Sequence, residues 1–173
     1  MEKIVCQTCV SEKTALRCGL CDEATCKSCS QFLDSDAFSF LPEIPAPLSK
    51  EVYCHACFES QVRSAKEDYE RTMAAAANID VYFKDQGKET RLIPRSKTIK
   101  YVINECADRD ELILRFAFRA VLDGFKTLVD VDITPVKMRD GTFQRTIFKG
   151  TAVPANAEEK HIIKDKSFRH NPN

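Results

Sequence analysis

The chain has 173 residues, of which 43% are hydrophobic and 30% are charged, and its formal net charge is zero. This length corresponds to one ordinary domain or two small ones, with enough apolar residues for a core. The first residues, MEKIVCQTCV, contain no long apolar run, so we expect neither a secretory signal nor a membrane span. We therefore expect a cytoplasmic protein whose nine cysteines stay reduced and serve metal binding rather than disulfides.

Charge is distributed unevenly along the chain. Residues 1–60 carry five Lys and Arg against nine Asp and Glu, a balance of −4, and the remainder carries 21 against 17, a balance of +4. If eight thiolates bound two zinc ions, the N-terminal part would become more negative still. A module of this charge argues against a nucleic acid or an anionic membrane as its partner.

Eight of the nine cysteines form four CxxC pairs, which are separated by eight, four and twenty-four residues. A CxxC turn places two sulfurs at two corners of a zinc tetrahedron, and two such turns complete the four-thiolate shell of a structural site. The sequence therefore predicts two Zn²⁺ per chain. Disulfides in an exported protein and a redox switch that releases zinc on oxidation are the alternatives. The pairs are Cys6/Cys9, Cys18/Cys21, Cys26/Cys29 and Cys54/Cys57.

The pairs resemble those of FYVE-type zinc fingers over residues 6 to about 60. The segment CGLCDEATCKSCS matches the family's second and third pairs, and SFLPEIPAPLSKEVYCHACFES resembles its loop and closing pair. Spacing alone also allows sequential ligation, with the first two pairs on one zinc and the last two on the other. The resemblance instead implies a cross-brace, with Cys6, Cys9, Cys26 and Cys29 on zinc 1 and Cys18, Cys21, Cys54 and Cys57 on zinc 2.

The basic lipid-binding segment of FYVE domains is missing from this chain. The residues that match it, next to Cys18, contain a single cation, Arg17, and the chain has no tryptophan. Because phosphate binding needs several convergent donors, we expect the zinc scaffold without phosphoinositide binding. RING and B-box fingers, which are also cross-braced interaction modules, are the nearest competing classes. His55, inside the last pair, is expected to be exposed or to lie outside the ligand shell.

Apolar residues and three prolines occupy the loop between the third and fourth pairs. We expect some of these side chains to pack on the zinc knuckles and others to form a docking patch for a protein partner. Cys106 stands apart from the pairs and is expected to be a buried small hydrophobe, and we expect no enzymatic activity. The apolar loop residues are Phe32, Phe38, Phe40, Leu41, Ile44 and Leu48.

The second half alternates between helical and strand patterns. A connecting helix is predicted over 59–77, which contains no Gly or Pro, and an α+β domain over 78–153, followed by a polar tail over 154–173. The α+β domain is expected to contain a hairpin turning at Gly87, a strand over 98–105, a helix ending at Asp123-Gly124, and a second hairpin turning at 139–141. In that second hairpin, alternation predicts one face with Val129, Val131 and Ile133 and a solvent face with Asp130 and Asp132.

Residues from about 100 to 153 resemble the YbjQ-like family of small bacterial proteins. The helix ending LDGF, the strand VDVDITPV and the return segment KGTAVP carry this resemblance. It implies an α+β domain that forms homo-oligomers. The expected fold is thus a small zinc-stabilised FYVE-like finger (1–58) joined by a helix to a small α+β domain.

The expected function is that of a non-enzymatic zinc-binding adaptor that contacts another protein through the finger. A phosphoinositide-dependent membrane-recruitment module, a RING-like ubiquitin-transfer platform and a zinc-based redox switch are the alternatives. The acidic charge of the finger argues against the membrane-recruitment module, and the cysteine spacing argues against the ubiquitin-transfer platform.

Overall fold

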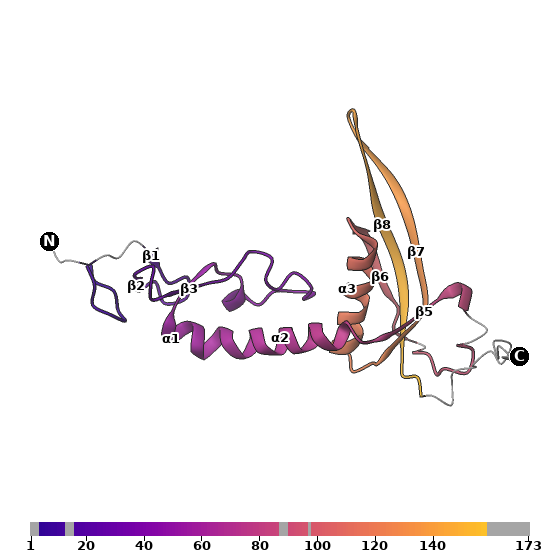
Figure 1. The fold of residues 1–173 in the computed structure, drawn as a ribbon, viewed down its shortest axis with the longest axis horizontal. Coiled ribbons are helices and arrows are strands. Elements are labelled where there is room, and N and C mark those ends of the chain that lie inside the picture. The colour runs from indigo at the N-terminus through magenta and orange to yellow at the C-terminus, as the bar shows by residue number, and fades with distance from the viewer. Residues whose placement is uncertain (1–3, 13–15, 87–89, 97, 159–173) are drawn as a thin grey trace, which may run out of the picture. The chain divides into compact units, whose positions relative to one another are not determined.

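In the computed structural model the chain forms two compact units, residues 1–71 and 72–173 (Figure 1). The structure describes residues 4–12, 16–86, 90–96 and 98–158. None of the helices in this part of the chain has the length and apolar character needed to cross a membrane.

The first unit contains two very short antiparallel strand pairs. Strands of two or three residues cannot hold a fold by themselves, so the cysteine clusters and a small core must fix this unit. The 3-10 turn η1 (Ala46–Leu48) lies in the long loop between the strands of the second pair. The pairs are β1 (Leu16–Arg17) with β2 (Ala24–Thr25), and β3 (Ser30–Phe32) with β4 (Val52–Cys54).

A small apolar core holds the long loop of the first unit. Tyr53 is fully buried there, and its hydroxyl donates to the Pro47 carbonyl at 2.8 Å and accepts from the Lys50 N–H at 3.1 Å. The rings of Phe38 and Tyr69 meet edge to face, with centroids 5.2 Å apart. The buried members of the core are Leu33, Phe38, Leu48, Tyr53, Phe58 and Val62.

The connecting helix begins inside the last cysteine pair rather than after it. A short helix α1 (His55–Cys57) leads directly into a π-helical turn η2 (Phe58–Val62) and then into α2 (Arg63–Ala76). The start expected at residue 59 is therefore too late, because the last pair itself adopts helical geometry. Ala65 and Tyr69, on the stripe that the sequence predicts, pack against the core of the first unit.

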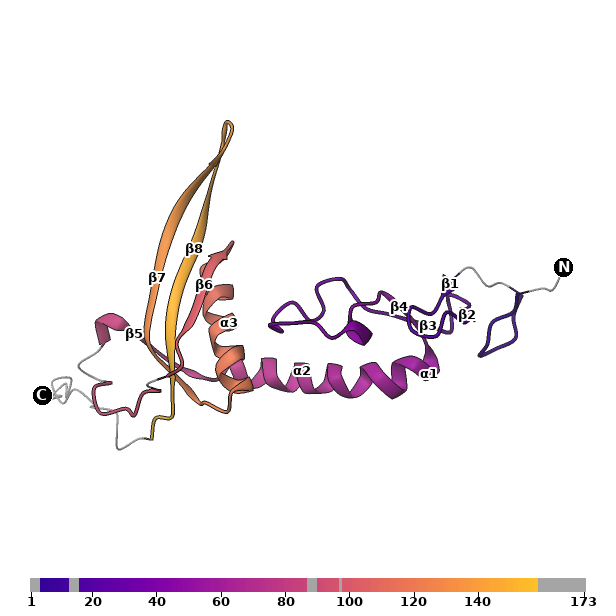
Figure 2. The same ribbon diagram turned by 180° about the vertical axis from the view of Figure 1, so that it is seen from behind.

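The second unit is a four-stranded sheet with one helix, α3 (Arg109–Leu122), packed on it (Figures 1 and 2). The strand order is β5-β7-β8-β6, with β5 parallel to β7 and the other neighbours antiparallel. Gly150 of β8 lies under α3, since a Cβ at this position would lie 3.1 Å from Leu112 and 3.2 Å from Phe116. The strands are β5 (Asp80–Phe83), β6 (Tyr101–Cys106), β7 (Thr127–Asp140) and β8 (Phe143–Ala155).

Helix α3 has the start and stop that its sequence predicts. The Asp108 carboxylate caps it by accepting from the N–H groups of Asp110 and Glu111, both at 2.9 Å. Gly124 follows its C-terminus with φ +81°, a left-handed conformation that favours glycine. The helix end expected at Asp123-Gly124 is therefore confirmed.

The first hairpin expected in this unit is wrong. Strand β5 pairs in parallel with the distant β7, and the chain continues into the 3-10 turn η3 (Lys84–Gln86) instead of returning beside β5. Gly87, the expected turn residue, lies outside the described residues. Ile93, expected on the returning strand, is 3% exposed and packs against Val129 and Ala155. The segment around Ile93 is thus held by packing against the sheet and not by pairing with β5.

A β-bulge in β7 overturns the expected alternation of its side chains. Val129 lies opposite Val153, whereas Asp132 lies opposite Thr151, so β7 has one residue more than β8 between these pairs. Val129 and Asp132 therefore share a face, and Ile133 points to the other one. Asp130, within the bulge, has φ +52°.

The polar tail expected from residue 154 begins later in the structure. Strand β8 continues through Ala155, and both Pro154 and Ala155 are buried. Pro154 lies opposite Leu128, and Ala155 lies opposite Thr127, in the register with β7. Pairing with Thr127 and Leu128, the first residues of β7, thus extends β8 by two residues beyond the expected end of the domain.

Candidate metal centres

The eight paired cysteines gather into two clusters. In each cluster the four Sγ atoms lie within 4.8 Å of one another. The Sγ atoms of Cys9 and Cys26 are 3.6 Å apart, and those of Cys21 and Cys54 are 3.8 Å apart. A tetrahedron with Zn–S bonds of about 2.3 Å has edges of about 3.8 Å, so the thiols are spaced as four zinc ligands would be.

The clusters combine alternate pairs along the chain, as in a cross-brace, and not consecutive ones. One cluster can hold a metal ion between the first and third pairs, and the other between the second and fourth. The clusters are Cys6, Cys9, Cys26 and Cys29, and Cys18, Cys21, Cys54 and Cys57.

The first two pairs are built by the same backbone turn. The N–H of Val10 donates to the Cys6 carbonyl at 2.8 Å, and the N–H of Asp22 donates to the Cys18 carbonyl at 2.9 Å. Val10 and Asp22 both have φ +58°, a left-handed conformation that is uncommon for non-glycine residues. This conformation turns the chain back one residue after the second cysteine, so that both sulfurs face the same point.

The third pair uses a related turn, and the fourth uses a helix. The N–H groups of Cys29 and Ser30 both donate to the Cys26 carbonyl at 3.0 Å. Cys54 ends strand β4, and Cys57 lies on the first helical turn after it. Each cluster thus draws its ligands from two rigid local structures that lie far apart in the sequence.

Hydrogen bonds and accumulating charge set the thiol pKa values. In the first cluster the pKa of Cys6 is lowered to about 5, mainly by the backbone N–H of Cys9. The pKa of Cys29 is raised to about 12, mainly by its hydrogen bond with the Cys26 side chain. In the second cluster burial raises the pKa of Cys18, but backbone N–H donors outweigh it and lower the pKa to about 6. Such clusters favour a bound divalent cation, which compensates several thiolates at once.

The donor set fits a structural zinc site. Four thiolates fill a tetrahedral shell and leave no position for a water or a substrate, whereas catalytic zinc sites keep one position open. In each cluster the first ligand of either pair is buried and one other ligand is exposed. Zinc would therefore lie near the surface of the unit, held in part by cysteines that are buried in its interior.

The remaining residues singled out in the sequence lie outside the clusters. Arg17 bonds to the Asp22 carboxylate at 3.0 Å, so the single cation next to Cys18 is already paired. His55 is exposed, with its Nδ1 3.8 Å from Glu59 Oε1. Cys106 is 6% exposed at the end of β6, as expected for a small hydrophobe.

The loop residues divide between core and surface. Phe38 and Leu48 are buried in the core of the first unit, whereas Phe32 is 52% exposed and Ile44 is 36% exposed. Phe38, Ile44 and Leu48 also line a small cavity of about 110 Å³ whose rim carries Asp34. The loop thus presents both an exposed apolar surface and a small pocket.

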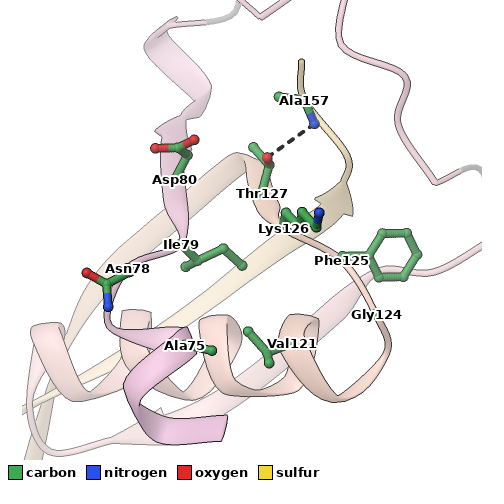
Figure 3. A pocket seen from close by; sticks show the side chains of 10 residues that line it. All are labelled: Ala75, Asn78, Ile79, Asp80, Val121, Gly124, Phe125, Lys126, Thr127 and Ala157. Carbon is green, nitrogen blue, oxygen red and sulfur yellow. Dashed lines mark hydrogen bonds between the residues drawn. The ribbon is translucent and has the colours of Figure 1, made fainter. Parts of the chain in front are cut away.

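The second unit contains a cavity of about 530 Å³ that the sequence does not reveal (Figure 3). Ala75 and Val121 face each other across it from the ends of α2 and α3, and Thr127 Oγ1 accepts from the Ala157 N–H at 3.2 Å. No motif marks it, because its residues come from three separate parts of the chain, 75–80, 121–127 and Ala157. The lining residues are Ala75, Asn78, Ile79, Asp80, Val121, Gly124, Phe125, Lys126, Thr127 and Ala157.

Comparison with known proteins found no relative: no family model, curated protein or solved structure matches the chain. The FYVE-type and YbjQ-like resemblances thus stay interpretations of the sequence. The fold and the site define a cysteine-rich unit that can hold two metal ions in a cross-brace-like arrangement, together with a small α+β unit.

Proposed function

We propose that each chain binds two Zn²⁺ and that the zinc-stabilised finger is a non-enzymatic interaction module for a protein partner. The observation that carries this proposal is the pair of four-thiolate clusters, each spaced for one tetrahedral ion. Zinc bound by four thiolates is closed to substrate, and its binding supplies on the order of 10 kcal/mol of folding free energy. A unit with such short strands needs this contribution.

The loop between the third and fourth pairs is the proposed contact surface. Phe32 and Ile44 are exposed there, and Ile44 also lines a small cavity that can take one apolar side chain. Three prolines stiffen the loop, so that little conformational entropy is lost on binding. Residues 31–51 carry four acidic side chains against one lysine, which favours a partner segment with an apolar anchor and basic neighbours.

A native mass spectrum of protein purified without added metal tests the zinc proposal. The expected result is two zinc ions per chain, retained at micromolar peroxide. One zinc or none, with masses of oxidised thiols, would instead support the redox switch. The subunit number in the same spectrum tests whether the α+β domain forms homo-oligomers, as its resemblance implies.

Photo-crosslinking tests the proposed contact surface. A photoreactive phenylalanine analogue at position 32 is expected to capture a discrete protein partner, and Ile44→Ser should reduce that capture. The same analogue at Ser60, an exposed helical position outside the loop, is the control. Equal capture from both positions, or zinc-dependent pelleting with phosphoinositide vesicles, would contradict the proposed protein contact.

A further inference from the structure

The β7–β8 hairpin extends well beyond its neighbours in the sheet (Figures 1 and 2). Strand β5 pairs with β7 only as far as Val131, and β6 pairs with β8 only from Phe148 onward. Residues 134–149, here called the arm, pair seven residues of β7 with seven of β8, and from Val136 to Ile147 these two strands pair only with each other. At about 3.3 Å per residue the arm is about 23 Å long.

Cations lie on both faces of the arm. Because cross-strand partners point to the same side, Lys137 and Arg139 lie on the face that carries Gly150, and Arg145 and Lys149 lie on the opposite face. All four are exposed, and the sequence of the arm contains one acidic residue, which gives a formal charge of +3.

Most of this charge has no acidic partner among the side chains that the structure describes. Arg145 bonds to Glu105 at 3.1 Å, with both side chains largely exposed. Lys137, Arg139 and Lys149 form no ion pair with any side chain that the structure describes.

Apolar and hydrogen-bonding side chains occupy the rest of the arm. Phe143, beside the turn, is 81% exposed, and Met138, diagonal to it on the same face, is 40% exposed. On the other face, the exposed polar side chains of Gln144 and Thr146 lie opposite Arg139 and Lys137 on the neighbouring strand. An isolated ribbon of this size is marginally stable in water, so a partner that covers it would also order it.

We propose that the arm binds duplex DNA by entering a groove. The major groove, about 12 Å wide, admits a two-stranded β-ribbon, and phosphates line both of its walls. The cations on the two faces of the arm are placed to reach both walls at once, and Phe143 at the tip can contact base edges or a base step.

The distribution of charge favours duplex DNA over two other partners, a membrane surface and a second copy of the arm. A membrane surface would meet only one face or the tip of the ribbon, and would leave the cations of the other face in solvent. A second arm would bring two formal charges of +3 together. The acidic residues counted for the finger belong to the first unit, whereas the arm belongs to the second.

Fluorescence anisotropy with a labelled DNA duplex of about 20 base pairs tests the proposal on the full-length, zinc-loaded protein. At about 50 mM KCl we expect a micromolar Kd. Four phosphate contacts predict a slope of log K against log salt of about −3.6, which corresponds to a roughly hundredfold loss of affinity at about 200 mM KCl.

Two charge-matched double variants locate the binding surface. Lys137→Gln with Arg139→Gln should weaken binding and reduce the magnitude of the salt slope by about 2. Lys100→Gln with Arg91→Gln removes the same charges from exposed positions outside the arm and should leave binding unchanged. Circular dichroism and thermal unfolding of both variants verify that the fold is retained.

The proposal would be overturned by equal effects of the two double variants or by the absence of DNA binding at low salt. It would also be overturned if the arm variant abolished pelleting with anionic phosphatidylserine vesicles or self-association while DNA binding persisted. None of these results depends on the protein partner proposed for the finger. A negative DNA result would therefore leave that proposal intact, and a failed crosslink would leave this one intact.

Discussion

The Sγ atoms of Cys9 and Cys26 lie 3.6 Å apart although seventeen positions separate the two residues in the chain. A metal ion between them would close a loop that contains the whole second cysteine pair, Cys18 and Cys21. The second cluster closes a longer loop that contains the third pair. The two closures interlock, so each site needs one of the first two cysteine pairs and one of the last two.

Two double substitutions distinguish this interlocked ligation from the sequential one. Cys9→Ser with Cys26→Ser removes ligands from one cluster, so we expect one zinc to remain. Cys9→Ser with Cys21→Ser removes one ligand from each cluster, so we expect both to be lost. Native mass spectrometry measures the count, and sequential ligation would reverse the two results. Cys106→Ala, outside the clusters, should keep two zinc ions.

Loss of the Tyr53 hydroxyl should destabilise the first unit. Tyr53→Phe leaves the Lys50 N–H and the Pro47 carbonyl without their partner, which should lower the free energy of unfolding by about 1 to 2 kcal/mol. Tyr53→Leu also removes the ring that meets Phe58 edge to face, and should cost more. Urea titration of the zinc-loaded protein measures both, and an unchanged midpoint for Tyr53→Phe would contradict the role of these bonds.

A side chain at Gly150 should disturb the contact between sheet and helix in the second unit. Its Cβ would lie 2.9 Å from the Asp132 carbonyl oxygen and 3.1 Å from Leu112. We expect Gly150→Ala to lower the free energy of unfolding by about 1 to 3 kcal/mol, as overpacking does. Gly141→Asn is the control, because that position has φ +60° with nothing within 4 Å, and asparagine tolerates this conformation. Equal effects on thermal unfolding would contradict the tight packing at Gly150.

Alkaline pH should destabilise the second unit through Tyr101. Burial, and then the hydrogen bond to Asp123 at 2.6 Å, raise the pKa of Tyr101 well above its usual value of about 10. Above about pH 10 the tyrosine of the unfolded chain loses its proton, while Tyr101 of the folded unit keeps it. The free energy of unfolding therefore falls as pH rises above this value. This contribution is fully present below about pH 10.

Urea titrations at about pH 9 and pH 11 measure this effect. Tyr101→Phe should show a smaller loss of stability between the two values than the natural sequence. Asp123→Asn should keep part of the loss, because burial is the larger cause of the shift. An identical loss in Tyr101→Phe would assign the alkaline sensitivity to other groups.

The metal-binding cysteines could be predicted from the sequence because each pair depends on a local turn. A CxxC turn is local, so the spacing alone predicted which residues can ligate a metal. The choice between cross-braced and sequential ligation depends on contacts such as that of Cys21 with Cys54, across 33 positions, and spacing left it open. The resemblance to a cross-braced family pointed to the arrangement that the structure has.

The ends of helix α3 could also be predicted from the sequence, but the partner of strand β5 could not. Asp108 and Gly124 act on their immediate neighbours, and both ends of α3 follow from them. Strand β5 instead pairs with residues more than forty positions away, and the sequence between them contains a plausible local turn at Gly87. The bulge at Asp130 has only a weak local signal, since aspartate tolerates the left-handed conformation but does not require it.

The bulge at Asp130 also determines which face the outer side chains of β7 occupy. If the same residues of β7 paired with β8 without a bulge, every residue after Asp130 would move by one position along β8, and Lys137 and Arg139 would point to the opposite face. Deletion of Asp130 would remove the additional residue together with the bulge, so Lys137 would still lie opposite Thr146 and keep its face. The outer strand should thus tolerate the loss of this residue without a change in the orientation of its cations.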